Sequence, residues 1–248
     1  AAQGWNDRDP SIPASEWTPA QRAQYEDIAT AMLSAADQTT ALVKLTPHRV
    51  VRELYEQSIA YWRAYADRIA NYTAVDNHLA QVAASAANSL VWICSAIHFG
   101  SAAARAPLVP PSATPLEVAT VGNPSEPTRF LTTSSEVCKE WADETSAFDA
   151  ATAVWLGTDA GVPASQWGPE QQQIYVEVST VMRTNAAKIQ ELGMRSRNPV
   201  FYDFATLAAQ YRRAFVQSFP SYVPSDAYLA NTAAELVAAI NNACPVAG

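Results

Sequence analysis

The sequence predicts an all-α protein built from two copies of one helical bundle. Of its 248 residues, 49% are apolar and only 8 are Gly, and Ala recurs in runs, a composition that favours helix over sheet. The sequence also matches itself at one offset of 150 residues. Within each copy, apolar residues recur at spacings of three and four, as the buried face of a helix requires.

The repeat aligns residues 12–94 with residues 162–244 without a gap. Roughly a quarter of the aligned positions are identical. The identities include residue types that seldom match by chance, namely Pro-Ala-Ser-x-Trp at 13–17 and 163–167, Tyr25 with Tyr175, Met32 with Met182, Tyr72 with Tyr222, and Cys94 with Cys244. We therefore interpret the chain as a tandem duplication.

Each copy is expected to contain three helices in the same order. Thr18, Pro19 and Gln21 form a capping-box pattern that begins the first helix. The second helix follows a proline in each copy, and Pro220 ends it in copy two. The third helix ends near the matched cysteines.

Copy two is expected to have a fourth helix upstream, over residues 134–156, with Trp155 in its last turn. Trp5 lies at the matching position of copy one, so copy one keeps only the end of this helix. A complete unit is then an antiparallel four-helix bundle, and the first unit lacks its first helix.

A proline-rich stretch separates the copies. Residues 106–128 hold six prolines, which favour extended polyproline structure over packing. The predicted domains are an incomplete bundle repeat over 1–104, a linker over 105–130 and a second bundle repeat over 131–248.

The charge excludes some classes of partner. A net charge of -8 and a pI near 4.9 disfavour nucleic acid and anionic lipid, because such binders need clustered Lys and Arg. No uninterrupted apolar run reaches the roughly 18 residues that span a bilayer. The sequence has no initiator Met or signal peptide, which fits a processed product with a targeting segment or membrane tether upstream of Ala1.

Three cysteines point to an oxidising compartment. Cys138 opens the upstream helix of copy two and Cys244 closes its last helix, so both lie at one end of an up-down bundle and are predicted to pair. The partner of Cys94 would lie before Ala1. Three reduced thiols and a Cys94–Cys138 cross-link are the alternatives. A disulfide implies an extracytoplasmic location.

The Ala-rich duplicated bundle, with Pro-Ala-Ser-x-Trp and a terminal Cys in each copy, resembles exported cell-envelope proteins of actinobacteria, of the mycobacterial type. The resemblance implies a location at the cell envelope. It brings no activity and no functional residue.

No motif for catalysis or for metal or nucleotide binding is present, so we expect no catalytic residue, no metal and no cofactor. Arg63 and Arg213 lie among apolar residues of the second helices. An antiparallel hairpin could bring them to Asp76 and Asp226, as structural ion pairs. The alternative is that each Arg holds an anionic ligand.

The copies differ most at the end of the third helix. Copy one has Val91 and Trp92 where copy two has Asn241 and Asn242. Because Asn is expected to face solvent, the matched apolar residues predict a covered apolar surface. The candidate partner-binding residues are Val91, Trp92, Ile97 and Phe99. The other copy, the linker or the missing N-terminal segment could also cover them.

These observations favour an extracytoplasmic, non-enzymatic scaffold or protein-interaction module of the cell envelope. The alternative is a carrier or sensor that binds a small apolar or lipidic molecule in a bundle cavity, which would need several hundred Å³.

Overall fold

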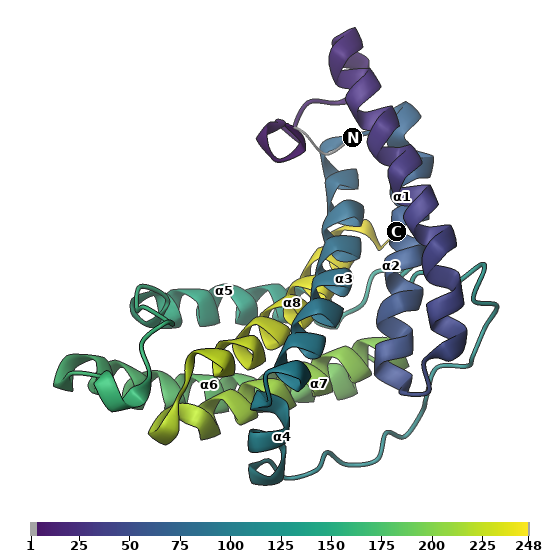
Figure 1. The fold of residues 1–248 in the computed structure, drawn as a ribbon. Coiled ribbons are helices and arrows are strands. Elements are labelled where there is room, and N and C mark those ends of the chain that lie inside the picture. The colour runs from purple at the N-terminus through teal and green to yellow at the C-terminus, as the bar shows by residue number, and fades with distance from the viewer. Residues whose placement is uncertain (1–3, 248) are drawn as a thin grey trace. The chain divides into compact units, whose positions relative to one another are not determined.

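The computed structural model describes residues 4–247, and this part of the chain forms helices and no strands (Figure 1). The all-α prediction is confirmed. The α-helices are α1 (Pro19–Leu45), α2 (Arg49–Arg68), α3 (Asn77–His98), α4 (Ser101–Arg105), α5 (Val137–Leu156), α6 (Pro169–Arg195), α7 (Pro199–Ser218) and α8 (Ala227–Ala243).

Among the described residues, the first of two compact units comprises residues 4–87, 120–134 and 242–247. Its α1 and α2 pack side by side as a hairpin (Figure 1). The predicted capping box begins α1: the Gln21 backbone N–H donates to Thr18 Oγ1 at 3.2 Å, and the Thr18 N–H donates to Gln21 Oε1 at 2.9 Å. These bonds satisfy backbone donors that the helix leaves free.

An aromatic cluster closes one end of this hairpin. Trp17 stacks on Tyr25 with ring centroids 3.9 Å apart and an interplanar angle of 25°. Tyr72 lies against both rings and donates its hydroxyl hydrogen to the Pro10 carbonyl at 2.8 Å. Trp17 and Tyr72 are both buried, so the cluster is part of the hydrophobic core and not a binding site for a ligand.

The second unit comprises Asn88–Ala119 and Ser135–Asn241. Here α6 and α7 form the hairpin, and α5 packs along α6. Trp141 of α5 is 1% exposed and meets Phe201 of α7 edge-on at 5.0 Å. Trp155, in the last turn of α5, meets Phe215 at 5.6 Å.

A buried polar network ties α5, α6 and α7 together. Arg212 is buried, donates to Asn185 Oδ1 and lies 4.0 Å from the centroid of the Phe148 ring. Asn185 in turn donates to Glu144 Oε1 at 2.6 Å. Burial lowers the pKa of Arg212 to about 10.

Elements and contacts recur at the offset of 150 residues. Helices α1 and α6 both have 27 residues, and α2 and α7 both have 20. Trp167 stacks on Tyr175 at 3.9 Å and 27°, and the Tyr222 hydroxyl donates to the Ala160 carbonyl at 2.7 Å. This recurrence supports our interpretation of a duplication, which remains a prediction about origin.

The compact units differ in extent from the predicted domains. Residues 88–104 group with the second unit, where Trp92 and Phe99 stack on Tyr228. Residues 120–134, predicted as linker and the start of the second repeat, group with the first unit. Gln57 of α2 donates to the Thr128 carbonyl at 3.2 Å and accepts from the Phe130 N–H at 2.9 Å. Part of the predicted linker is therefore packed.

The stretch Ala74–His98 is long and apolar enough to cross a membrane, judged by length and composition, with a mean hydropathy of 1.3. The sequence-based search missed it because small and polar residues interrupt its apolar runs. Core helices of other proteins meet the same criterion. Of the 18-residue segment that meets it here, 44% is buried within the protein. The tether expected upstream of Ala1 lies outside the described residues.

Candidate functional site

The end of α3 carries an exposed apolar surface. Val91 is 56% exposed, Ile97 63% and Phe99 55%. Just after the helix, Gly100 has a left-handed backbone (φ 81°), a conformation that residues with a side chain seldom adopt. We call Val91, Trp92, Ile97 and Phe99 the α3-end surface. It lies within the second unit.

Trp92 is not a free side chain. It is half-buried and stacks on Tyr228 of α8 at 5.8 Å and 22°. Phe99 stacks on the same ring at 5.2 Å and 25°. Tyr228 therefore holds both aromatic side chains in place, and Val91 and Ile97 are the residues of this surface most open to a partner.

The premise that pointed to this surface is wrong in one respect. Asn241 and Asn242 are half-buried, not solvent-facing. Asn242 Oδ1 lies 2.9 Å from His78 Nδ1 within the first unit, which explains its burial. The α3-end surface is therefore a candidate binding site because Val91 and Ile97 are exposed, and not because of the comparison with Asn241 and Asn242.

The cysteines divide into two kinds. Cys138 and Cys244 are disulfide-bonded. Cys94 is free and exposed, three residues from both Val91 and Ile97. Residues at this spacing lie along one side of a helix, so the thiol belongs to the α3-end surface.

The predicted ion pairs need correction. In the first unit, Arg63 pairs with Asp37 at 2.7 Å, and Asp76 pairs with Arg68 at 2.9 Å. Arg68, in the last turn of α2, is closer along the chain to the turn that holds Asp76. Arg63, more than a turn earlier, points to α1 instead.

In the second unit, Asp226 pairs with Arg105 at 2.8 Å, and Arg213 donates to Gln190 Oε1 at 2.8 Å. The two aspartates keep one shared role. Asp76 accepts the N–H of Thr73, and Asp226 accepts that of Val223, so each carboxylate caps its short turn.

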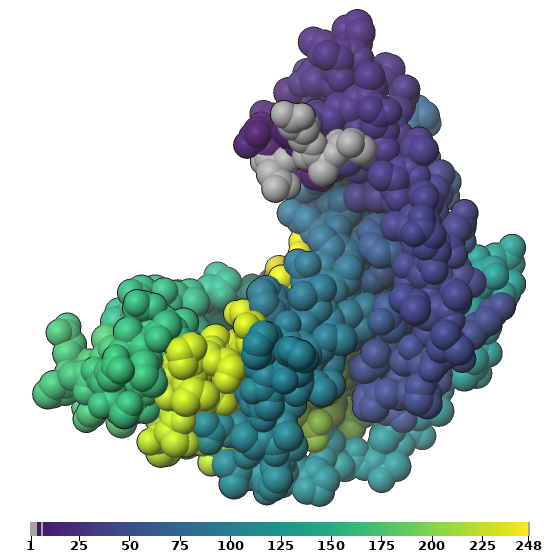
Figure 2. All heavy atoms as spheres, in the orientation of Figure 1, coloured from purple at the N-terminus to yellow at the C-terminus, as the bar shows by residue number. Residues whose placement is uncertain are grey.

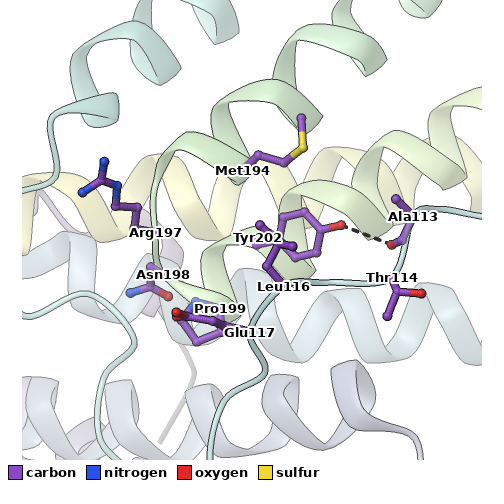
Figure 3. A pocket seen from close by; sticks show the side chains of 10 residues that line it. Ala113, Thr114, Leu116, Glu117, Met194, Arg197, Asn198, Pro199 and Tyr202 are labelled. Carbon is purple, nitrogen blue, oxygen red and sulfur yellow. Dashed lines mark hydrogen bonds between the residues drawn. The ribbon is translucent and has the colours of Figure 1, made fainter.

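A half-open cavity of about 510 Å³ lies beside the start of α7 (Figure 3). Tyr202 points into it and donates to the Ala113 carbonyl at 3.4 Å. Met194, Leu116 and Pro199 supply apolar wall, with Arg197 and Glu117 beside them. Sequence reasoning missed this cavity because residues 113–117, read as linker, form one wall.

The described residues contain no group of three or more His, Cys, Asp or Glu side chains that could hold a metal ion.

A family model described as "Mycobacterial ESX-1 associated protein" matches residues 1–248. The chain belongs to this family. A curated relative, an uncharacterized protein of Mycolicibacterium smegmatis (strain MKD8), is 49% identical over 246 residues. The alignment covers 99% of this chain and 65% of the relative, so the chain spans just under two thirds of that protein's length. No solved structure matches the chain. The mycobacterial type inferred by resemblance is confirmed.

Proposed function

We propose that the chain is a non-enzymatic, extracytoplasmic interaction module that binds a protein partner of the ESX-1 secretion system through the α3-end surface. The observation that carries this proposal is the exposure of Val91 and Ile97 near the end of α3 and of Phe99 directly after it. Clustered exposed apolar side chains mark interaction sites. The family's description supplies the class of partner.

The disulfide-bonded cysteines support the extracytoplasmic location. Cytosolic thiols are kept reduced, whereas exported proteins keep their disulfides. Cys138 and Cys244 are disulfide-bonded in this chain. The net charge of -8 further favours a protein partner over nucleic acid or an anionic membrane.

A second candidate function is a carrier of a small apolar or lipidic molecule. The cavity in Figure 3, at about 510 Å³, is within the range of small-molecule sites. Its walls combine apolar side chains with the Tyr202 hydroxyl and the charged groups of Arg197 and Glu117. These groups would suit a ligand that has an apolar body and a polar end.

Native mass spectrometry of protein purified from its mycobacterial source tests the proposal. We expect a stoichiometric complex with an ESX-1 component for the unchanged protein and for Val154→Asp, a control at a residue 72% exposed on α5. Val91→Asp and Ile97→Asp should lose the partner while their far-UV circular dichroism and thermal unfolding stay unchanged.

These positions are better probes than Trp92, whose stacking on Tyr228 would be lost as well. Retention of the partner by both Val91→Asp and Ile97→Asp would overturn the proposal. A co-purifying small apolar molecule without a protein partner would support the carrier instead.

A further inference from the structure

Helix α5 covers the α6–α7 hairpin of the second unit through contacts that can be traced one by one. Trp141 meets Phe201, Phe148 lies over Arg212, and Glu144 accepts from Asn185. Glu140 pairs with Arg195 at 2.5 Å and lies 3.9 Å from Lys188. Phe201, Arg212 and Asn185 are all buried as a result.

The matching positions of the α1–α2 hairpin carry uncharged side chains. At an offset of 150 residues, Phe201 corresponds to Val51, Arg212 to Trp62, Asn185 to Ala35, Arg195 to Leu45 and Lys188 to Gln38. Leu42 corresponds to Leu192 and lies on the same stripe of its helix. We call Ala35, Leu42, Leu45, Val51 and Trp62 the α1–α2 face.

The α1–α2 face is apolar and open. Leu42 is 45% exposed, whereas Leu192 is fully buried. Leu45 is 77% exposed, and Ala35, Val51 and Trp62 are half-buried. Trp62 packs against the buried residues Ala36, Val43 and Ile59 and still keeps part of its surface exposed. Figure 2 shows α1, in purple, on the surface of the first unit.

Trp5 indicates what covers this face. Its ring packs against Tyr25 at 5.1 Å and Tyr65 at 6.4 Å, edge-on in both cases. Tyr65 corresponds to Phe215, which Trp155 meets from the last turn of α5. Trp5 therefore occupies the place of the end of an α5-type helix. Gly4, directly before it, has the left-handed backbone (φ 75°) that commonly follows the end of a helix.

We propose that, in the full-length protein, an amphipathic helix that ends before Gly4 docks on the α1–α2 face as α5 docks on α6 and α7. The curated relative has residues outside the part aligned with this chain, since the alignment covers 65% of its length. The proposal does not depend on the ESX-1 partner proposed above.

The side chains of the face also define the chemistry of this helix. Helix α5 presents Glu140 and Glu144 to Arg195 and Asn185. Leu45 and Ala35 offer a carboxylate no partner, and an unpaired carboxylate against apolar surface is costly. The docking helix therefore presents uncharged side chains at these two positions, and α5 itself fits the face poorly.

Thiol labelling of the natural full-length protein tests the proposal. In a Cys94→Ser background, Leu42→Cys should react at least about tenfold more slowly than Leu33→Cys, because a docked helix must open first. Leu33 is the matched control: it is 41% exposed on the same helix, and its spacing of about two and a half turns from Leu42 places it on the opposite side of α1. Leu45→Cys is a second probe at a more exposed position.

Three results would overturn the proposal. Equal reactivity of the thiols at positions 42 and 33 would show an uncovered face. Protection that grows with protein concentration would show that a second copy covers it. A photo-crosslinker at position 42 should join the segment before Trp5 in the same chain, and an adduct with any other segment or chain would also contradict the docking.

Discussion

The ion pair between Arg105 and Asp226 gives the sharpest stability prediction. Arg105 donates to both carboxylate oxygens, at 3.1 Å and 2.8 Å, and also to the hydroxyl and carbonyl oxygens of Ser221. Its side chain is 12% exposed and that of Asp226 is 1% exposed. The matched aspartate, Asp76, pairs with Arg68, whose side chain is 57% exposed.

We therefore expect Arg105→Met and Arg68→Met to differ. Methionine keeps most of the apolar stem and removes the charge. Arg105→Met leaves a buried carboxylate without its cation, which costs about 3 kcal/mol. That loss should lower the Tm by roughly 6 to 12 °C in a chain of this size. Arg68→Met should cost less, because water screens the exposed Arg68 head group, although the Asp76 side chain is itself only 4% exposed.

Thermal and urea unfolding, followed by circular dichroism at pH 7, measure both variants. Adding Asp226→Asn to Arg105→Met should restore part of the loss, since the orphaned charge is then gone. The reasoning would be refuted by equal losses for the two arginine variants, or by a double variant less stable than Arg105→Met.

Three further predictions follow from the packing. Trp141→Ala should lower the free energy of unfolding by about 3–5 kcal/mol. Trp155→Ala should cost less, because Trp155 is only half-buried; the reverse order in urea unfolding would contradict the account. Tyr72→Phe and Tyr222→Phe should each cost about 1 kcal/mol, for one lost hydrogen bond per unit, and a loss in one variant alone would argue against matched surroundings. The Arg195 hydrogen bond lowers the pKa of Glu140 below 4.5. The Glu140–Arg195 pair therefore stabilises the folded state above pH 4.5, and this contribution is lost as the pH falls through the lowered pKa of Glu140. In Arg195→Ala, NMR of the Glu140 carboxyl group should show a pKa that returns toward 4.5.

Local patterns predicted the helices well because the signals are local. Thr18 and Gln21 specify the start of α1, and the Pro-Ala-Ser-x-Trp segments recur before α1 and α6. The partners of charged side chains were less predictable, because they depend on which segments far apart in the sequence become neighbours in the fold. Asp226 takes its cation from Arg105, more than a hundred residues away. No spacing rule would select that arginine over Arg213.

The candidate site was predictable in part. The apolar run at the end of α3 indicated Val91 and Ile97, and both are exposed. The stacking of Trp92 and Phe99 on Tyr228 was not predictable, since it requires α8 to lie against the end of α3. The cavity around Tyr202 escaped notice because residues 113–117 have no helical pattern of their own.

The measurement that tests the proposed function most directly is photo-crosslinking in living mycobacteria, with a benzophenone amino acid at Val91 and, as the control, at Val154. The account predicts one protein adduct from position 91, identified by mass spectrometry as an ESX-1 component, and no such adduct from position 154. Lipid adducts alone, or the same adducts from both positions, would contradict it.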